Sequence, residues 1–122
     1  MFEFSKSARL TRPEEFKRAL RVRPVVRSNL FFCHYIQSES HDGTNVSRLG
    51  LIVPKRFAKK ATTRNAIKRV IREAYRICRA TLPTGDLVIR LKSAPPADSL
   101  SNLKSSIRSD IDLILLRMSR LR

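Results

Sequence analysis

The segment from Thr63 to Arg79 constrains the fold most strongly, because its apolar and basic residues separate at helical spacing. At about 100° per residue, the apolar side chains share one arc of roughly 120°. They are Ile67, Val70, Ile71, Ala74, Ile77 and Cys78. Basic and amide side chains share a separate arc of roughly 140°: Arg64, Asn65, Lys68, Arg69, Arg72, Arg76 and Arg79. The pattern predicts an amphipathic helix with one buried face and one cationic face.

Two strands are predicted ahead of this helix. A capping-box pattern at Thr11-Arg12-Pro13-Glu14 first predicts the start of a short helix, which Pro24 ends. Runs rich in strand-forming residues follow at Asn29–Gln37 and Val46–Val53. The polar stretch between these runs contains Asp42-Gly43 and predicts a hairpin connection.

A third strand and a final helix are predicted after the amphipathic segment. The strand spans Asp86–Lys92, and Ser99 is suited to cap the helix that follows. Apolar residues recur in that helix at spacings of three and four, as in a core-facing stripe: Leu100, Leu103, Ile107, Ile111, Ile114, Leu115 and Met118. The order is therefore α-β-β-α-β-α, which predicts a single-domain α+β sandwich of sheet and helices.

Length and charge describe one domain with a polyanionic partner. The chain has 122 residues, a size typical of a single domain, and we treat residues 1–122 as one unit whose first eight residues are flexible. Lys and Arg outnumber Asp and Glu by 26 to 10, so the net charge is 26 − 10 = +16. Arg is more abundant than Lys, which favours bidentate recognition of phosphate.

Several classes of protein are disfavoured by the same sequence. No apolar run approaches the roughly 18 to 20 residues that span a bilayer, and the N-terminus lacks the order of a signal peptide. The two cysteines, Cys33 and Cys78, stand inside predicted elements, and we interpret them as buried thiols in a reducing, cytoplasmic compartment. No metal-ligand spacing, phosphate-binding loop or nucleophile motif is present, so we expect no metal, no bound cofactor and no catalytic side chain.

The cationic face of the amphipathic helix has no obvious structural purpose. Like charges at i,i+4 repel by a few tenths of a kcal/mol per pair, and only Glu73 is available to offset them. A polyanion covering the face would remove this repulsion. Arg64 and Asn65 are expected in the first turn, where free backbone N–H groups also favour phosphate. The preceding basic residues extend the surface: Lys55, Arg56, Lys59 and Lys60.

Aromatic residues on other elements predict a second binding feature. Strand alternation places Leu30, Phe32, His34 and Ile36 on one face and Phe31, Cys33 and Tyr35 on the other. Phe16 on the first helix could face Phe32 and His34 across a groove. Such rings stack on unpaired bases, each contributing about 1–3 kcal/mol. The alternative interpretation, that Phe16 and Phe32 are core residues, remains open at this point.

Two basic motifs resemble those of the bacterial ribonuclease P protein family. They are Lys55-Arg56-Phe57 and the run from Thr63 through Arg64-Asn65-Ala66, Ile67-Lys68-Arg69 and Arg72-Glu73. Arg9-Leu10, Glu15-Phe16, Arg48-Leu49-Gly50-Leu51 and the segment Asp86–Lys92 add weaker matches. Ala66 departs from the family motif, which has a second Arg there.

The resemblance implies a mixed sheet with an unusual left-handed β-α-β crossover, and a monomeric accessory subunit rather than a catalyst. In that family a large RNA using Mg²⁺ removes the 5′ leader of precursor tRNA. Arg64, Asn65, Lys68, Arg69 and Arg72 would contact the RNA subunit, and Lys59, Lys60 and Arg76 would extend this surface. A cleft for the single-stranded leader would be lined by Phe16, Leu20, Phe32 and His34 and flanked by Lys55, Arg56 and Lys92.

Three other interpretations remain open from the sequence. A ribosomal or other structural RNA-binding protein would explain the size and the charge equally well. A DNA-binding regulator could use residues 63–79 as a recognition helix, although residues 46–60 do not form the short helix that usually precedes one. A membrane-active cationic protein conflicts with the predicted three-stranded sheet.

Overall fold

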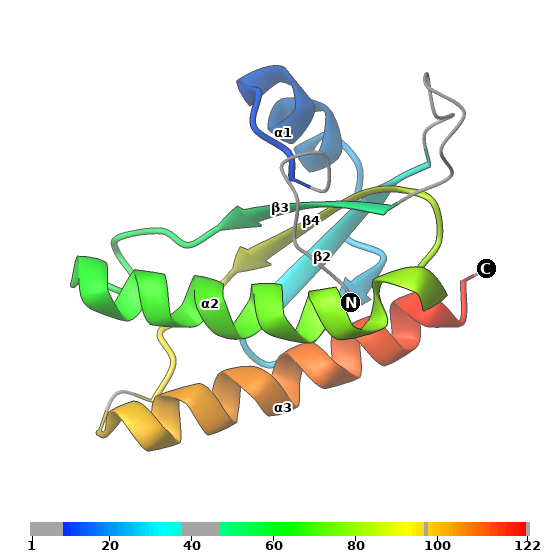
Figure 1. The fold of residues 1–122 in the computed structure, drawn as a ribbon. Coiled ribbons are helices and arrows are strands. Elements are labelled where there is room, and N and C mark those ends of the chain that lie inside the picture. Colours follow the sequence, from blue (N-terminus) through cyan, green and yellow to red (C-terminus); the bar gives the residue numbers. More distant parts are fainter. Residues whose placement is uncertain (1–8, 38–46, 97, 122) are drawn as a thin grey trace.

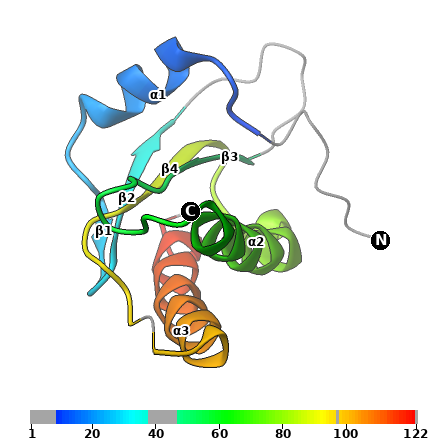
Figure 2. The same ribbon diagram turned by 90° about the vertical axis from the view of Figure 1, so that its left-hand side faces the viewer.

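A computed structural model describes residues 9–37, 47–96 and 98–121. A four-stranded sheet has helix α1 on one face and helices α2 and α3 on the other (Figures 1 and 2). In chain order the elements are α1 Pro13–Leu20, β1 Val26–Arg27, β2 Phe31–Ile36, β3 Ser47–Ile52, α2 Ala61–Cys78, the 3₁₀ turn η2 Arg79–Thr81, β4 Gly85–Leu91 and α3 Leu100–Ser119. The predicted α-β-β-α-β-α order and α+β class are confirmed, with β1 and η2 as additions.

The strand order is β1-β2-β4-β3, so the last strand in sequence lies inside the sheet. β4 runs antiparallel to β2 and parallel to β3, and α2 connects β3 to β4. The hairpin predicted between the runs at 29–37 and 46–53 is therefore wrong, because these runs form β2 and β3, and β4 lies between them. The connecting residues 38–46 and the first eight residues lie outside the described part of the chain.

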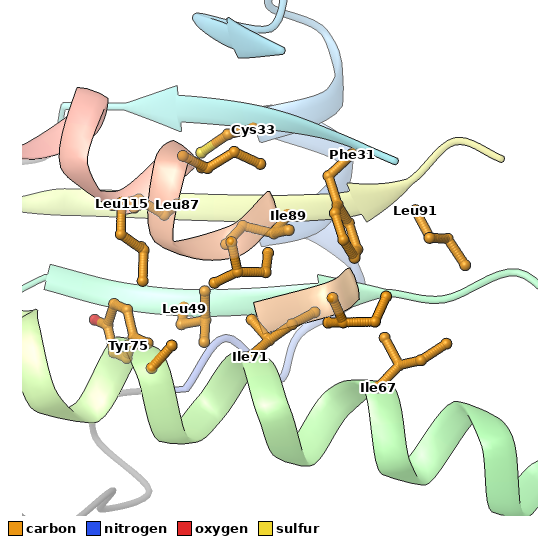
Figure 3. Packing of buried hydrophobic residues seen from close by; sticks show 14 of the residues in the cluster. Phe31, Cys33, Leu49, Ile67, Ile71, Tyr75, Leu87, Ile89, Leu91 and Leu115 are labelled. Carbon is orange, nitrogen blue, oxygen red and sulfur yellow. The ribbon is translucent and has the colours of Figure 1, made fainter. Parts of the chain in front are cut away.

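The larger core lies between the sheet and the helix pair α2 and α3 (Figure 3). Phe31 and Cys33 of β2 point into it, as alternation predicts, and burial raises the pKa of Cys33 to about 12. The predicted α3 stripe is buried from Leu103 to Met118, whereas Leu100 is 58 % exposed. Leu100 is the first residue of α3, so no turn of the helix precedes it to bring it over the core.

Two helix starts differ from their predictions. The cap of α1 is Arg12 rather than Thr11, because the carboxylate of Glu15 accepts a hydrogen bond from the Arg12 backbone N–H at 3.2 Å. α2 begins at Ala61, so Arg64 lies beyond the first turn and its backbone N–H donates to the carbonyl of Lys60. The predicted cap of α3 is confirmed, since the Ser99 hydroxyl accepts from the backbone N–H of Asn102.

The sheet face opposite the large core is only partly covered. Cross-strand pairing aligns Gly50, Val88 and His34 in one row and Ile52, Arg90 and Phe32 in the next. α1 packs over the first row through a small cluster in which Leu10, Ala19 and Val88 are buried. The second row lies beyond α1 and is half-buried. This row therefore presents the aromatic ring of Phe32 beside the positive charge of Arg90.

Candidate RNA-binding surface

Four polar side chains of α2 form its outward face, here called the basic ridge: Asn65, Lys68, Arg69 and Arg72. Asn65 and Arg69 are exposed, and Lys68 and Arg72 are half-buried. Within the described residues no carboxylate pairs with these three cations. Burial, together with repulsion from Arg9, lowers the pKa of Arg72. The ridge is therefore a surface of unneutralised positive charge.

Three further cations of the predicted helix also serve the fold. The guanidinium group of Arg64 donates to the backbone carbonyls of Ala58 and Lys59 at 2.9 and 2.8 Å. Arg76 forms an ion pair with Glu73 one turn earlier. Arg79 donates from Nε to the carbonyl of Ser47. These three side chains bond to groups of the protein itself. The part of the cationic face that can bind phosphate freely is therefore narrower than the sequence indicates.

The loop between β3 and α2 carries the remaining predicted cations. The side chains of Lys55, Arg56, Lys59 and Lys60 are exposed and continue the positive surface toward the start of α2. The guanidinium group of Arg56 lies 4.8 Å from the centroid of the Phe57 ring, a distance within the range of a cation–π contact. The structure thus places these four residues at the N-terminal end of the ridge.

Two hollows border the ridge. The larger, of about 370 Å³, is lined by Arg9, Asn65, Arg69, Arg72, Glu73 and Arg76. The smaller, of about 210 Å³, is lined by Arg9, Leu10, Thr11, Phe16, Leu49, Leu51, Lys68 and Arg72. Arg9 belongs to both hollows, although only a weak motif match at Arg9-Leu10 singled it out in the sequence. The smaller hollow brings the ring of Phe16 next to two ridge cations, which joins the aromatic and basic features.

Phe16 is seated on a glycine of β3. A Cβ atom added to Gly50 would lie 2.7 Å from Cε1 of the Phe16 ring and 3.0 Å from Leu10. Real Cβ atoms do not approach so closely, so only glycine leaves room for the ring at this depth. The ring is half-buried, with one part in the small cluster under α1 and another part lining the smaller hollow.

Phe32 lies on a separate part of the same sheet face. Three cations lie near its ring. Arg90 and Lys92 are 4.7 Å from the ring centroid, and Arg27 is 5.8 Å away. We call the ring and these three cations the Phe32 platform. The Nε atom of Arg90 is buried without a hydrogen-bond partner among the described residues. Of these three cations the sequence singled out only Lys92, because the short strand β1 was not predicted and Arg90 stood inside an apolar strand.

The other two predicted cleft residues differ in exposure. Leu20 is 40 % exposed at the end of α1, whereas His34 is 3 % exposed. The Nδ1 atom of His34 lies 3.0 Å from the carbonyl oxygen of Val22, in the chain that follows α1. Burial lowers the pKa of His34, and the nearby Arg90 lowers it further. The imidazole is therefore covered and offers no face for stacking.

No helix in the described ranges is long and apolar enough to cross a membrane. The same ranges contain no group of three or more His, Cys, Asp or Glu side chains that could hold a metal ion.

Comparisons with known proteins agree with the fold. A sequence model of the family described as Ribonuclease P matches residues 4–113. The chain is similar to proteins named ribonuclease P protein component from Bordetella petrii, at 44 % identity over 91 % of both chains, and Bordetella avium, at 46 % identity over 93 % of this chain and 92 % of the relative.

Solved structures show the same fold. The Staphylococcus aureus RNase P protein solved at 2.0 Å superposes with a TM-score of 0.74 at 20 % identity, covering 94 % of this chain and 97 % of that one. The Thermotoga maritima RNase P protein superposes with a TM-score of 0.66 at 26 % identity, covering 89 % and 96 %.

Proposed function

Because the chain belongs to the ribonuclease P protein family and is thus an RNA-binding subunit of that ribonucleoprotein, we propose that its basic ridge and its aromatic groups bind different RNAs. The basic ridge binds the backbone of the RNA subunit. The hollow at Phe16 and the Phe32 platform bind the single-stranded 5′ leader of precursor tRNA. The RNA subunit, using Mg²⁺, performs the cleavage.

The observation that carries this proposal is the shared lining of the smaller hollow. Lys68 and Arg72 of the ridge and the ring of Phe16 all border it. An RNA strand that leaves the ridge therefore meets an aromatic face without leaving positive potential. Cations that track the backbone, combined with rings on which bases stack, are the usual means of binding single strands without sequence preference.

The Phe32 platform supports the same function further along the sheet face. Its three cations gather around one half-buried ring, and a nearby phosphate would offset their mutual repulsion. The buried Nε–H of Arg90 has no partner among the described residues, and leaving such a donor unsatisfied costs about 1–3 kcal/mol. A bound phosphate or base edge would supply the acceptor. Lys92, which the resemblance implies for the leader, belongs to this platform.

The physical role of the protein is electrostatic. Precursor tRNA and the RNA subunit are both polyanions that must approach closely, and a preformed cationic surface reduces their repulsion. Neutralising each single-strand phosphate releases counterions and adds about −0.7 to the slope of log K against log salt. Only the precursor has a leader, so contacts at Phe16 and Phe32 favour substrate over mature product.

Reconstitution tests this function directly. The protein is mixed with ribonuclease P RNA at low Mg²⁺, and cleavage of precursor tRNA is measured with and without protein. We expect clear stimulation that decreases as Mg²⁺ is raised, because added cations then replace part of the protein's charge. Absence of stimulation at every Mg²⁺ concentration would contradict the proposed role.

The leader assignment is tested by Phe16→Ala. We expect the variant to weaken binding of leader-bearing precursor by about fivefold or more, since one stacked base contributes about 1–3 kcal/mol. Affinity for mature tRNA should not change. Leu116→Ala, an exposed apolar residue on α3, serves as the control. Equal losses for precursor and mature tRNA would make Phe16 a packing residue only.

The free protein is proposed to be monomeric and to act in the cytoplasm. The net charge of +16 makes two copies repel each other at low salt. Sedimentation of the isolated protein tests the first point, and a species of twice the monomer mass at low salt would contradict it.

A further inference from the structure

Asp86 is a buried carboxylate in the middle of the sheet. It lies on β4, next to Arg48 of β3 and Ile36 of β2, and is 1 % exposed. The guanidinium group of Arg48 binds the Asp86 carboxylate in a bidentate manner, with Nε donating to Oδ1 at 2.9 Å and Nη2 donating to Oδ2 at 3.1 Å. Paired, hydrogen-bonded geometry of this kind is what a buried charge requires.

The pair extends from the sheet to α1. Arg48 also forms an ion pair with Glu15, and Arg18 lies 3.6 Å from Asp86. Glu15 is the residue that caps α1 through the backbone N–H of Arg12. These four side chains, Glu15, Arg18, Arg48 and Asp86, form one ion cluster that joins both turns of α1 to the paired strands β3 and β4.

α1 depends on such contacts. With eight residues it is far shorter than the roughly 12–15 residues that an isolated helix needs to be even marginally stable in water. The apolar cluster beneath it buries only Leu10, Ala19 and Val88 among the described residues. Because this apolar contact is small, we expect the ion cluster to fix the position and direction of α1 on the sheet.

We propose that Asp86 is a positioning residue for leader binding. Through Arg48 and Arg18 it fixes α1 against the sheet, so that Phe16 stays seated on Gly50 with its ring bordering the smaller hollow. Asp86 itself is covered and touches no RNA. This inference rests on the proposed role of Phe16 and adds the residue that holds the ring in place.

The main experiment is a double-mutant cycle in the reconstituted holoenzyme. KM and kcat are measured for two precursors that differ only in leader length, one with a single leader nucleotide and one with several. The variants are Asp86→Asn, Phe16→Ala and the double variant. Asp112→Asn is the matched control, because it removes an exposed carboxylate from a surface pair on α3.

Asp86→Asn is expected to raise KM for the long-leader precursor by about fivefold or more, the scale of one lost stacking contact. The short-leader precursor and kcat should change by less than about twofold. In the double variant KM should equal that of Phe16→Ala within about twofold, because residues that act as a unit are not additive. Losses that multiply in the double variant would show that Asp86 acts independently of Phe16 and would overturn the proposal.

Amide hydrogen exchange of the free protein separates this inference from the proposed function. Asp86→Asn should speed exchange in α1 while α2 and α3 keep their protection; unchanged exchange in α1 overturns the positioning role. If Phe16→Ala shows no dependence on leader length, the proposed function of the ring fails, and exchange alone decides whether Asp86 holds α1. Should Asp86→Asn not fold, Glu15→Gln carries both measurements, since it keeps the capping acceptor and removes only the charge that Arg48 meets.

Discussion

The two faces of the sheet are built in opposite ways. The face toward α2 and α3 is a continuous apolar core in which Phe31, Ile71 and Ile89 have no exposed surface. The face toward α1 has a small apolar cluster, a buried ion cluster at Asp86 and a row of half-exposed ring and charge at Phe32. One face therefore supplies most of the stability, and the other presents the groups that we propose to bind the leader.

A small basic domain can keep polar and aromatic groups exposed on one face because the other face supplies its stability. Apolar burial contributes about 25 cal/mol per Å² and needs no particular partner geometry. The ion cluster contributes little net stability, because its arginine side chains are partly exposed, and its main effect is on the position of α1. Stability and positioning are thus separable, and substitutions should affect them separately.

The largest effect on stability is expected in the large core. Ile71→Ala removes a fully buried side chain of α2 and should lower the free energy of unfolding by about 2–5 kcal/mol. Urea denaturation measures the loss. Where the variant remains folded, its preference for leader-bearing precursor should equal that of the parent. A change in leader preference would break the division between the two faces.

A smaller effect with a different signature is expected at Gly50. Gly50→Ala places a methyl group against Phe16 and should destabilise by about 1–3 kcal/mol, as overpacking does. Because the ring must move, affinity for leader-bearing precursor should fall while affinity for the RNA subunit stays constant. Urea denaturation together with filter binding of the two RNAs checks both parts. Unchanged affinity for leader-bearing precursor would show that the close contact between Phe16 and Gly50 does not affect leader binding.

The basic ridge should respond in salt dependence rather than in stability. Lys68→Ala is expected to reduce the steepness of log K against log salt by about 0.7, the contribution of one single-strand phosphate. Lys104→Ala, a cation exposed on α3, is the matched control and should leave the slope unchanged. Binding isotherms for RNA over a range of salt concentrations provide the measurement. Equal slopes for parent and Lys68→Ala would remove Lys68 from the phosphate contacts.

The smallest effect is expected at His34. Its pKa in the folded protein is lowered, chiefly by burial, from about 6.5 in the unfolded chain. Below that value the unfolded state binds more protons, so this group makes stability fall as pH falls. His34→Gln should flatten the pH dependence of unfolding between about pH 7.5 and 5.5 by less than about 1 kcal/mol. An unchanged pH dependence would show that the imidazole is hydrated rather than covered.

Local pattern predicted much of the fold. Helical spacing separated Ile67 and Ile71 from the ridge, and alternation placed Phe31 and Cys33 in the core, because each element has only one large apolar partner surface. The same reasoning put Ile77 among the buried residues, yet it is 53 % exposed. It lies in the last turn of α2, where Tyr75 takes the buried position and Ile77 falls at the rim of the apolar face.

Long-range features could not be predicted in the same way. The hairpin expectation followed from the turn residues Asp42-Gly43 between two strand-like runs, but turn chemistry does not show that β4 enters between those strands. Two-residue β1 is too short to produce a pattern. The pairing of Arg48 with Asp86 joins residues 38 positions apart, and the burial of His34 depends on the chain after α1. Pairing and coverage of this kind are set by tertiary contacts.

The inner position of β4 affects how the domain is made. Its last residue, Leu91, is three quarters of the way along the 122-residue chain, yet β4 joins β2 to β3 in the described sheet. During synthesis from the N-terminus, the sheet cannot close until this strand has left the ribosome. Pairings between distant segments also slow folding, so this domain is expected to fold late, after translation of β4 is complete.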